Sequence, residues 1–182
     1  GRYDLGAFVI SGRSIESSEW NALIAEIERR NIPLITLGAG DRISYGDNKI
    51  AILSPDAAWL QSAELNDTSL VGLVTAPPVD FLLTGDIGSN VEDDLVKRGV
   101  GLDADILKVG HHGSKYSSAE AFLAAVDPKL AVIEVGNNRY GHPTNEALSR
   151  LASVGAMLFR TDHSGTIKVI VDAGTLKVFT QK

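Results

Sequence analysis

The sequence lacks several features that would place it in familiar protein classes. It contains no cysteine, which excludes a disulfide framework, a thiolate metal site and a cysteine nucleophile. Its apolar runs, such as Leu130–Ile133, fall far short of the roughly 20 residues that a helix needs to cross a bilayer. No signal peptide is visible, because Arg2 and Asp4 interrupt the start and no apolar core with a cleavage site follows.

Positive charge is also scarce. The 17 lysines and arginines are outnumbered by 23 acidic residues, which gives a formal net charge of −6. This balance argues against the broad basic face of a typical nucleic-acid-binding module. A phosphate substrate remains compatible with it, because bound divalent cations would reverse the local charge of a site.

Methionine and histidine are rare as well. Met157 is the only methionine, so we expect the chain to be a processed product or an excised piece of a longer protein. Three of the four histidines, His111, His112 and His142, lie in two short polar turns. This concentration indicates a functional site more than chance scatter.

Length and hydrophobic pattern indicate an α/β fold. With 182 residues, 44% of them hydrophobic, the chain can bury a core, and we expect a single domain over 1–182. Apolar periodicity alternates between the helical and the strand pattern, which predicts layered sheets with outer helices. The predicted helices are 16–30, 90–98, 118–126 and 145–154, and the predicted strands are 7–10, 32–37, 41–45, 49–53, 66–75, 79–83, 106–109, 130–135, 157–160, 166–171 and 176–180.

Two apolar strands end in side chains that bind metals. The segment 81–86 delivers Asp86 just after Thr-Gly, and the segment 105–114 ends in His111 and His112. An exposed carboxylate at a strand end can bridge or ligate cations, and imidazoles are common ligands. Taken alone, Asp86 is better explained as the N-cap of the helix that follows. If the strand continued through the two histidines, they would point to opposite sides, and only one would be a ligand.

A third imidazole and several polar groups extend the predicted site. His142, between Gly and Pro, suits a proton donor or an oxyanion partner, although a loop histidine that only satisfies backbone carbonyls is the alternative. The backbone amides around Ser114 could bind an anion near the start of the next helix. The alternative is that this segment is an ordinary turn. Arg139 is placed to neutralise a phosphate, unless it is simply a solvated surface arginine. Polar residues 66–70 could form hydrogen bonds that support the metal site, and they fit an ordinary turn equally well. His163 is expected in a hairpin, and we assign it no role in the site.

Taken together, these motifs resemble one family. In the order of the sequence they are 66–70, 83–86, 107–114, 138–143 and 160–162. They resemble the metallo-β-lactamase-like domain at the C-terminal end of the ComEC competence proteins, the channels of bacterial DNA uptake. The resemblance implies an αββα sandwich with a dinuclear site of two Zn or Mn ions. The expected reaction is hydrolysis of phosphodiester bonds in the DNA strand that is not imported. The resemblance also implies a soluble domain of an inner-membrane protein, on the extracytoplasmic side and attached to that protein's channel region.

The resemblance also assigns roles to the residues. Asp86 is the expected bridging ligand and catalytic carboxylate, His111 the terminal ligand with His112 as the alternate, and His142 acts near the scissile phosphate. Lys108, by its position beside the site, is a further candidate for substrate binding through a phosphate contact, together with Ser114 and Arg139.

One expected motif is absent. No histidine precedes His111, so the sequence lacks the His-x-His-x-Asp-His motif, or its Asp variant, of this superfamily. We therefore expect a chain that lacks N-terminal strands and part of its ligand set, binds metal weakly or not at all, and is inactive by itself. An uncovered sheet edge or apolar face would favour self-association. Whether the chain acts as an enzyme thus stays open, with a non-catalytic DNA-guiding or interaction domain and a hydrolase of another ester as alternatives.

Overall fold

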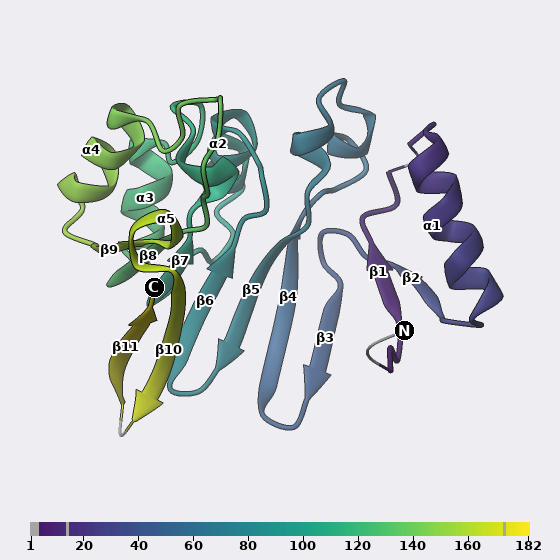
Figure 1. The fold of residues 1–182 in the computed structure, drawn as a ribbon, viewed down its shortest axis with the longest axis horizontal. Helices are drawn as coiled ribbons and strands as arrows, with labels where there is room; N and C mark the ends of the chain where they lie inside the picture. The colour runs from purple at the N-terminus through teal and green to yellow at the C-terminus, as the bar shows by residue number, and fades with distance from the viewer. Residues whose placement is uncertain (1–3, 14, 173) are drawn as a thin grey trace.

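A seven-stranded mixed sheet forms the centre of the molecule (Figure 1). The computed structural model describes residues 4–13, 15–172 and 174–182. The strands of the large sheet follow the order β3-β4-β5-β6-β7-β8-β9. They are β3 (Arg42–Tyr45), β4 (Asn48–Ser54), β5 (Val71–Ala76), β6 (Val79–Leu83), β7 (Ile106–Lys108), β8 (Leu130–Ile133) and β9 (Met157–Arg160). The predicted α/β class is confirmed.

The direction of the strands changes within this sheet. From β3 to β6 the neighbours are antiparallel, and from β6 to β9 they are parallel. Helices α2 (Ser89–Lys97), α3 (Glu120–Val126) and α4 (Asn145–Ser153) connect the parallel strands. The buried cluster joins these helices to strands β6, β7 and β8, for example through Leu95, Phe122 and Leu107. Continuous apolar runs in these strands are typical of parallel strands that are buried by helices.

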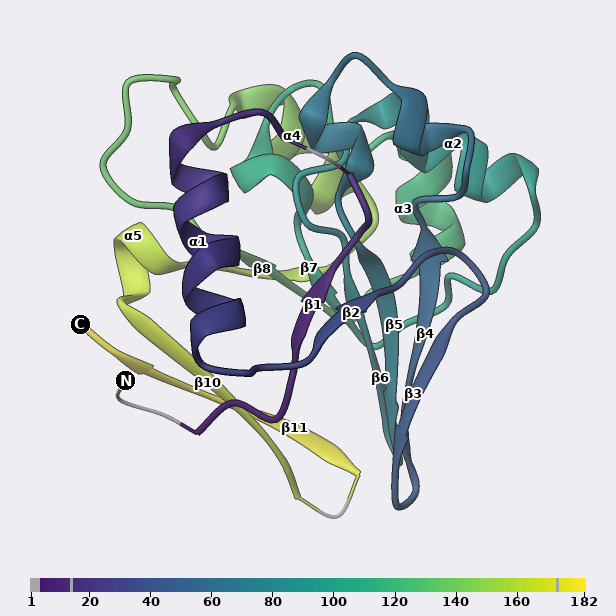
Figure 2. The same cartoon turned by 90° about the vertical axis from the view of Figure 1, so that its right-hand side faces the viewer.

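Two small sheets lie on the other side of the large sheet (Figure 2). In one of them β1 (Phe8–Ile10) pairs in parallel with β2 (Leu34–Thr36), and α1 (Ser18–Arg29) connects the two strands. The other is a hairpin of β10 (Thr166–Asp172) and β11 (Thr175–Gln181). Ser17 caps α1, because its hydroxyl accepts from the Trp20 amide at 3.0 Å.

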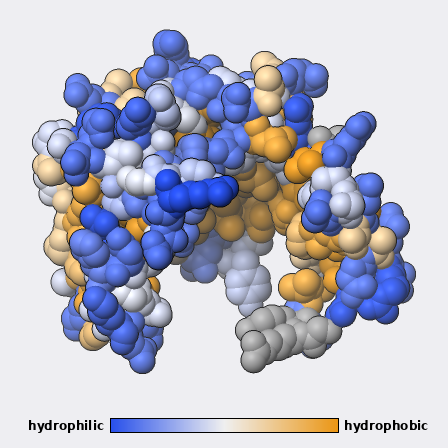
Figure 3. Space-filling model, turned by 45° about the horizontal axis from the view of Figure 1, so that its top comes forward, coloured by the Kyte–Doolittle hydropathy of each residue, from blue (hydrophilic) through white to orange (hydrophobic). Residues whose placement is uncertain are grey.

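The two small sheets leave apolar side chains exposed. Figure 3 shows a hollow lined by apolar side chains between the α1 side of the molecule and the rest. Val9, Ile35, Leu83, Ile170 and Phe179 are 38 to 52% exposed. Exposed apolar surface of this kind favours association. Self-association of the chain stays a prediction.

Two sequence predictions were wrong in detail. Residues 66–69 do not begin a strand, because 3₁₀ turns η1 (Trp59–Gln61) and η2 (Leu65–Thr68) precede β5. Asp67 is buried in this turn and accepts from Asn90 at 2.8 Å, which holds the backbone away from the sheet. His163 lies in the short helix α5 (Thr161–Ser164) before the hairpin rather than in the hairpin turn itself.

Candidate active site

The polar turns predicted from the sequence meet at one edge of the large sheet. Asp86 follows β6, the two histidines follow β7, and the loop 134–144 with His142 follows β8. These three strands are parallel neighbours, so their carboxyl ends lie side by side. Such edges are the usual place for ligand sites in α/β proteins. The fold therefore brings Asp86, His111, His112 and His142 into one region.

The turn that carries Asp86 is tightly fixed. The buried Thr84 hydroxyl donates to the Lys108 carbonyl at 2.8 Å, which ties the end of β6 to β7. Gly85 has a φ of +55°, and a Cβ at this position would lie 2.7 Å from the Ser69 Cβ. The Asp86 amide donates to Ser69 Oγ at 3.3 Å. Only glycine therefore fits beside Ser69, and this contact fixes the direction in which Asp86 leaves the strand.

Asp86 does not cap the following helix. Gly88 is the N-cap of α2, so the simpler explanation of Asp86 from sequence is wrong. The Asp86 side chain is 38% exposed and lies beside His112 instead. Its carboxylate is therefore available to a ligand.

Both adjacent histidines have a left-handed backbone. β7 ends at Lys108, and His111 and His112 have φ values of 48° and 54° within the turn η3 (Gly110–Gly113). The strand therefore does not continue through the histidines, and the condition under which their side chains would lie on opposite sides is not met. Such conformations are uncommon outside glycine and are often found at functional sites. The His111 amide donates to the Gly85 carbonyl at 3.3 Å, which joins this turn to the one that carries Asp86.

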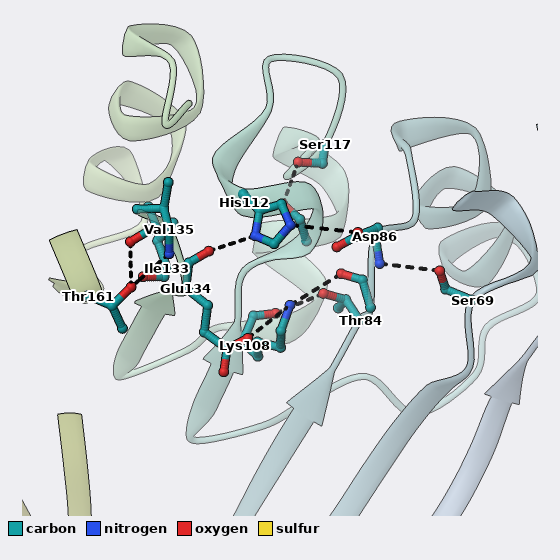
Figure 4. Close-up of polar contacts among 12 residues, drawn as sticks. Ser69, Thr84, Asp86, Lys108, His112, Ser117, Ile133, Glu134, Val135 and Thr161 are labelled. Carbon is teal, nitrogen blue, oxygen red and sulfur yellow. Dashed lines mark hydrogen bonds and ion pairs between the residues drawn. The ribbon is translucent and has the colours of Figure 1, made fainter. Parts of the chain in front are cut away.

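The His112 ring is oriented by a backbone carbonyl. Its Nδ1 lies 2.6 Å from the Glu134 carbonyl oxygen, so Nδ1 carries the proton that this hydrogen bond requires. Its Nε2 then faces the Asp86 Oδ2 at 3.7 Å, as the dashed lines in Figure 4 show. In the neutral ring, Nε2 and the carboxylate are both acceptors. Either a proton on Nε2 or a shared cation therefore stabilises this arrangement.

His142 is held by one asparagine side chain. Asn138 Oδ1 accepts from the amides of Tyr140 at 3.0 Å and His142 at 3.1 Å. Its Nδ2 donates to the carbonyls of His142 at 2.8 Å and Gly136 at 3.0 Å. The His142 ring lies edge-on to His111, with 5.5 Å between the ring centroids. The loop is thus a rigid support for this imidazole.

The surroundings of His142 favour its neutral form. Burial lowers the pKa of His142 below its ordinary value of 6.5, and the nearby His111 and His112 lower it further, while Asp86 acts in the opposite direction. Its ring is therefore neutral near pH 7 and has one N–H to donate and one nitrogen that accepts. A group of this kind suits proton transfer.

A buried carboxylate supports the next loop, and sequence reasoning missed it. Glu92 on α2 is fully buried and accepts from the amides of Ser118 at 2.7 Å and Ala119 at 2.8 Å. Arg150 on α4 donates to carbonyls of the same loop, including Ser118 at 2.8 Å and Lys115 at 2.9 Å. The sequence did contain a signal for this buried group. Glu92 directly follows Val91 on the apolar face of the helix predicted over 90–98.

The three predicted substrate-binding residues occupy different surroundings. Ser114 is buried, and its Oγ accepts from the Tyr116 amide at 3.3 Å. Lys108 Nζ lies 3.4 Å from the Gly85 carbonyl and 3.8 Å from Glu134, so it braces the two turns. Arg139 is exposed in the His142 loop.

His142 is part of the lining of two cavities. The first has a volume of about 390 Å³ and includes His112, Glu134 and Tyr140 in its lining. The second has a volume of about 460 Å³ and includes His111 and Tyr116. In the described part of the chain, no cluster of three or more His, Cys, Asp or Glu side chains is arranged to hold a metal ion.

The chain is similar to three bacterial proteins whose names refer to competence or recombination. No protein-family model matches the chain. It is 38% identical to ComE operon protein 3 of Bacillus subtilis over 130 residues, which are 71% of this chain and 16% of that protein. It is 40% identical to competence protein ComA of Neisseria gonorrhoeae over 114 residues, which are 62% of this chain and 16% of that protein. Recombination protein 2 of Haemophilus influenzae is 36% identical over 156 residues, and the match covers 76% of this chain and 19% of that protein.

The chain therefore corresponds to a segment of much longer relatives, between 16 and 19% of their length. Within residues 4–13, 15–172 and 174–182, no helix is both long enough and apolar enough to cross a membrane.

Proposed function

Because its homologues indicate a competence-related protein of the ComEC family, we propose that the chain forms part of a metallo-β-lactamase-like αββα domain that hydrolyses DNA. In this proposal the domain cleaves phosphodiester bonds in the strand that is not taken up. It stands on the extracytoplasmic side, attached to the membrane channel of the same protein. The observation that carries the proposal is the pair of acceptors, His112 Nε2 and Asp86 Oδ2, which face one another at 3.7 Å.

The chemistry of this pair fits a divalent cation. Zinc binds histidine nitrogen and carboxylate oxygen at about 2.1 Å, so two ligands at a tetrahedral angle lie about 3.4 Å apart. The observed 3.7 Å is close to this separation. The Glu134 carbonyl also fixes the tautomer that presents Nε2, as outer hydrogen bonds do for metal-bound histidines. A cation bound here would polarise a phosphate and lower the pKa of a bound water.

The other residues of the site have supporting roles in this proposal. Ser69 positions Asp86, and Asn66 Nδ2 lies 3.4 Å from His111 Nε2, which keeps that ring in place as a further ligand. His142 is neutral and rigidly held, so it is suited to move a proton at the scissile phosphate or at the leaving oxygen. A histidine-rich motif of the kind that this sequence lacks would supply the remaining ligands from the longer protein.

The test compares two proteins, this chain and a version extended about 60 residues upstream, about half a small domain. Metal content is measured by plasma mass spectrometry, and cleavage by gel assay with labelled DNA, a lactone and a phosphocholine ester. We expect two metals and metal-dependent DNA cleavage in the extended protein only. Asp86→Asn and His112→Ala should abolish both, and His163→Ala, which replaces an exposed histidine outside the site, should change neither. A folded, metal-loaded extended protein that cuts no DNA would refute the proposal.

One observation favours a second function. The described residues hold no cluster of three metal-binding side chains. A non-catalytic domain that guides DNA or contacts other parts of the uptake machinery would need no such cluster. Absence of bound metal in the extended protein, together with DNA binding that Asp86→Asn does not change, would support this function over hydrolysis.

A further inference from the structure

Two exposed tyrosines flank the candidate active site. The Tyr116 side chain is 66% exposed, and Tyr140 is 69% exposed. Both line the cavity of about 460 Å³ that also contains His111 and His142. Half of the four tyrosines in the sequence therefore lie at a single opening. Rings left in water contribute little to the core, so packing does not explain their position.

A cation lies over one face of each of these rings, so the opposite face is the one left for stacking. Lys115 Nζ is 5.0 Å from the centroid of the Tyr116 ring, and Arg139 Cζ is 5.5 Å from the centroid of the Tyr140 ring. An aromatic face next to a positive charge matches the chemistry of a nucleotide, which carries a flat base and a phosphate. Proteins that bind single strands combine these same two features.

The Tyr140 ring lies beside the His142 imidazole. The Tyr140 and His142 rings are 5.9 Å apart with an interplanar angle of 30°, so they present nearly the same orientation to the solvent. His111 stands edge-on to His142, with an interplanar angle of 84°. A base stacked on Tyr140 would therefore keep its phosphate within reach of the histidines.

Both tyrosines stand on rigid backbone. Asn138 Oδ1 accepts from the Tyr140 amide, and Ser114 Oγ accepts from the Tyr116 amide. Arg150 and Glu92 hold the loop after Tyr116 from the helix side. Binding a ligand would need little ordering of these loops, which favours affinity.

We propose that Tyr116 and Tyr140 form a stacking surface for the unpaired bases of single-stranded DNA. Lys115 and Arg139 neutralise the adjacent phosphates. A duplex offers no free base faces, so this surface selects the unpaired strand. The inference rests on the proposed function in that DNA is the ligand, and it narrows that ligand to a single strand.

The experiment is fluorescence anisotropy with a labelled 12-nucleotide strand of mixed sequence, in EDTA so that no cleavage occurs. The same strand is tested as a duplex and as an abasic strand with equal phosphates. We expect the chain to prefer the single strand with bases over both. Tyr116→Ala and Tyr140→Ala should each weaken this binding by about 5- to 150-fold, the range that corresponds to one stacked base.

Controls separate stacking from other effects. Tyr45→Ala removes a tyrosine that is 85% exposed at the far end of the β3–β4 hairpin, and it should leave binding unchanged. Tyr116→Phe and Tyr140→Phe keep the ring and should also bind normally. The inference is overturned if the chain does not bind the single strand, if the abasic strand binds equally well, or if the two alanine variants bind like the parent.

The outcome is independent of the proposed hydrolysis. Stacking-dependent binding without cleavage by the extended protein would contradict the nuclease alone. Cleavage by the extended protein, with unchanged binding in both alanine variants, would contradict the stacking surface alone.

Discussion

Replacing Glu92 by glutamine tests how burial controls the ionisation of a carboxyl group beneath the site. Glu92 has no exposed surface. Burial raises the pKa of its carboxyl from 4.5 to about 7, although two amide hydrogen bonds and the charge of Arg150 act in the opposite direction. In the unfolded chain water hydrates this carboxyl, so it ionises near its ordinary pKa.

The direction of the pH effect follows from proton binding. Between the two pKa values the folded state holds a proton on Glu92 that the unfolded state has released. Stability therefore falls as the pH rises through this window. The contribution of the neutral carboxyl is complete below about pH 4.5 and is lost above about pH 7. A rise to about 7 corresponds to about 3 kcal/mol in the free energy of unfolding, since each pKa unit is worth about 1.4 kcal/mol.

The assay is urea unfolding followed by circular dichroism, from about pH 4 to about pH 8. Glu92→Gln carries no titrating group at this position, so subtracting its stability from that of the parent isolates Glu92. We expect this difference to fall by about 3 kcal/mol across the range. Glu120→Gln, which replaces an exposed carboxyl on α3, is the matched control. A difference that stays constant or rises with pH would show that the hydrogen bonds and Arg150 outweigh burial.

Three further predictions concern the glycine turn, the histidine loop and the exposed apolar side chains. Gly85→Ala should lower the free energy of unfolding by about 2 to 5 kcal/mol, because the new Cβ clashes with Ser69 and the backbone is left-handed. Gly46→Ala, where the backbone is also left-handed but the surrounding space is open, should lower it by only about 1 to 2 kcal/mol. Equal losses in urea unfolding would contradict the close contact. Asn138→Ala should speed hydrogen exchange at the His142 amide about 10-fold, and unchanged exchange would refute the role of this side chain. Sedimentation velocity should show self-association that Phe179→Lys weakens, and a monomer at all concentrations would exclude it.

Local patterns in the sequence predicted most elements. The helix predicted over 16–30 corresponds to α1, which Ser17 caps. The hairpin of 41–45 and 49–53 corresponds to β3 and β4, because Gly46 permits the positive φ of a tight turn. These features depend on residues a few positions apart, so the sequence contains them directly. The order of apolar strands and polar turns also predicted that Asp86 and the histidines belong together.

The sequence by itself thus determined the α/β class, most helices and strands, and the set of polar turns at their ends. The tertiary structure decided how the polar groups face one another. It placed His111 and His112 in left-handed backbone, directed His112 toward Asp86 through the Glu134 carbonyl, and buried Glu92 beneath the loop after the histidines. These outcomes depend on contacts between segments more than 20 residues apart, such as His112 with Glu134 and Glu92 with Ser118. Periodicity and propensity report only on near neighbours, whereas backbone dihedrals and ring orientation are set by packing across the sheet.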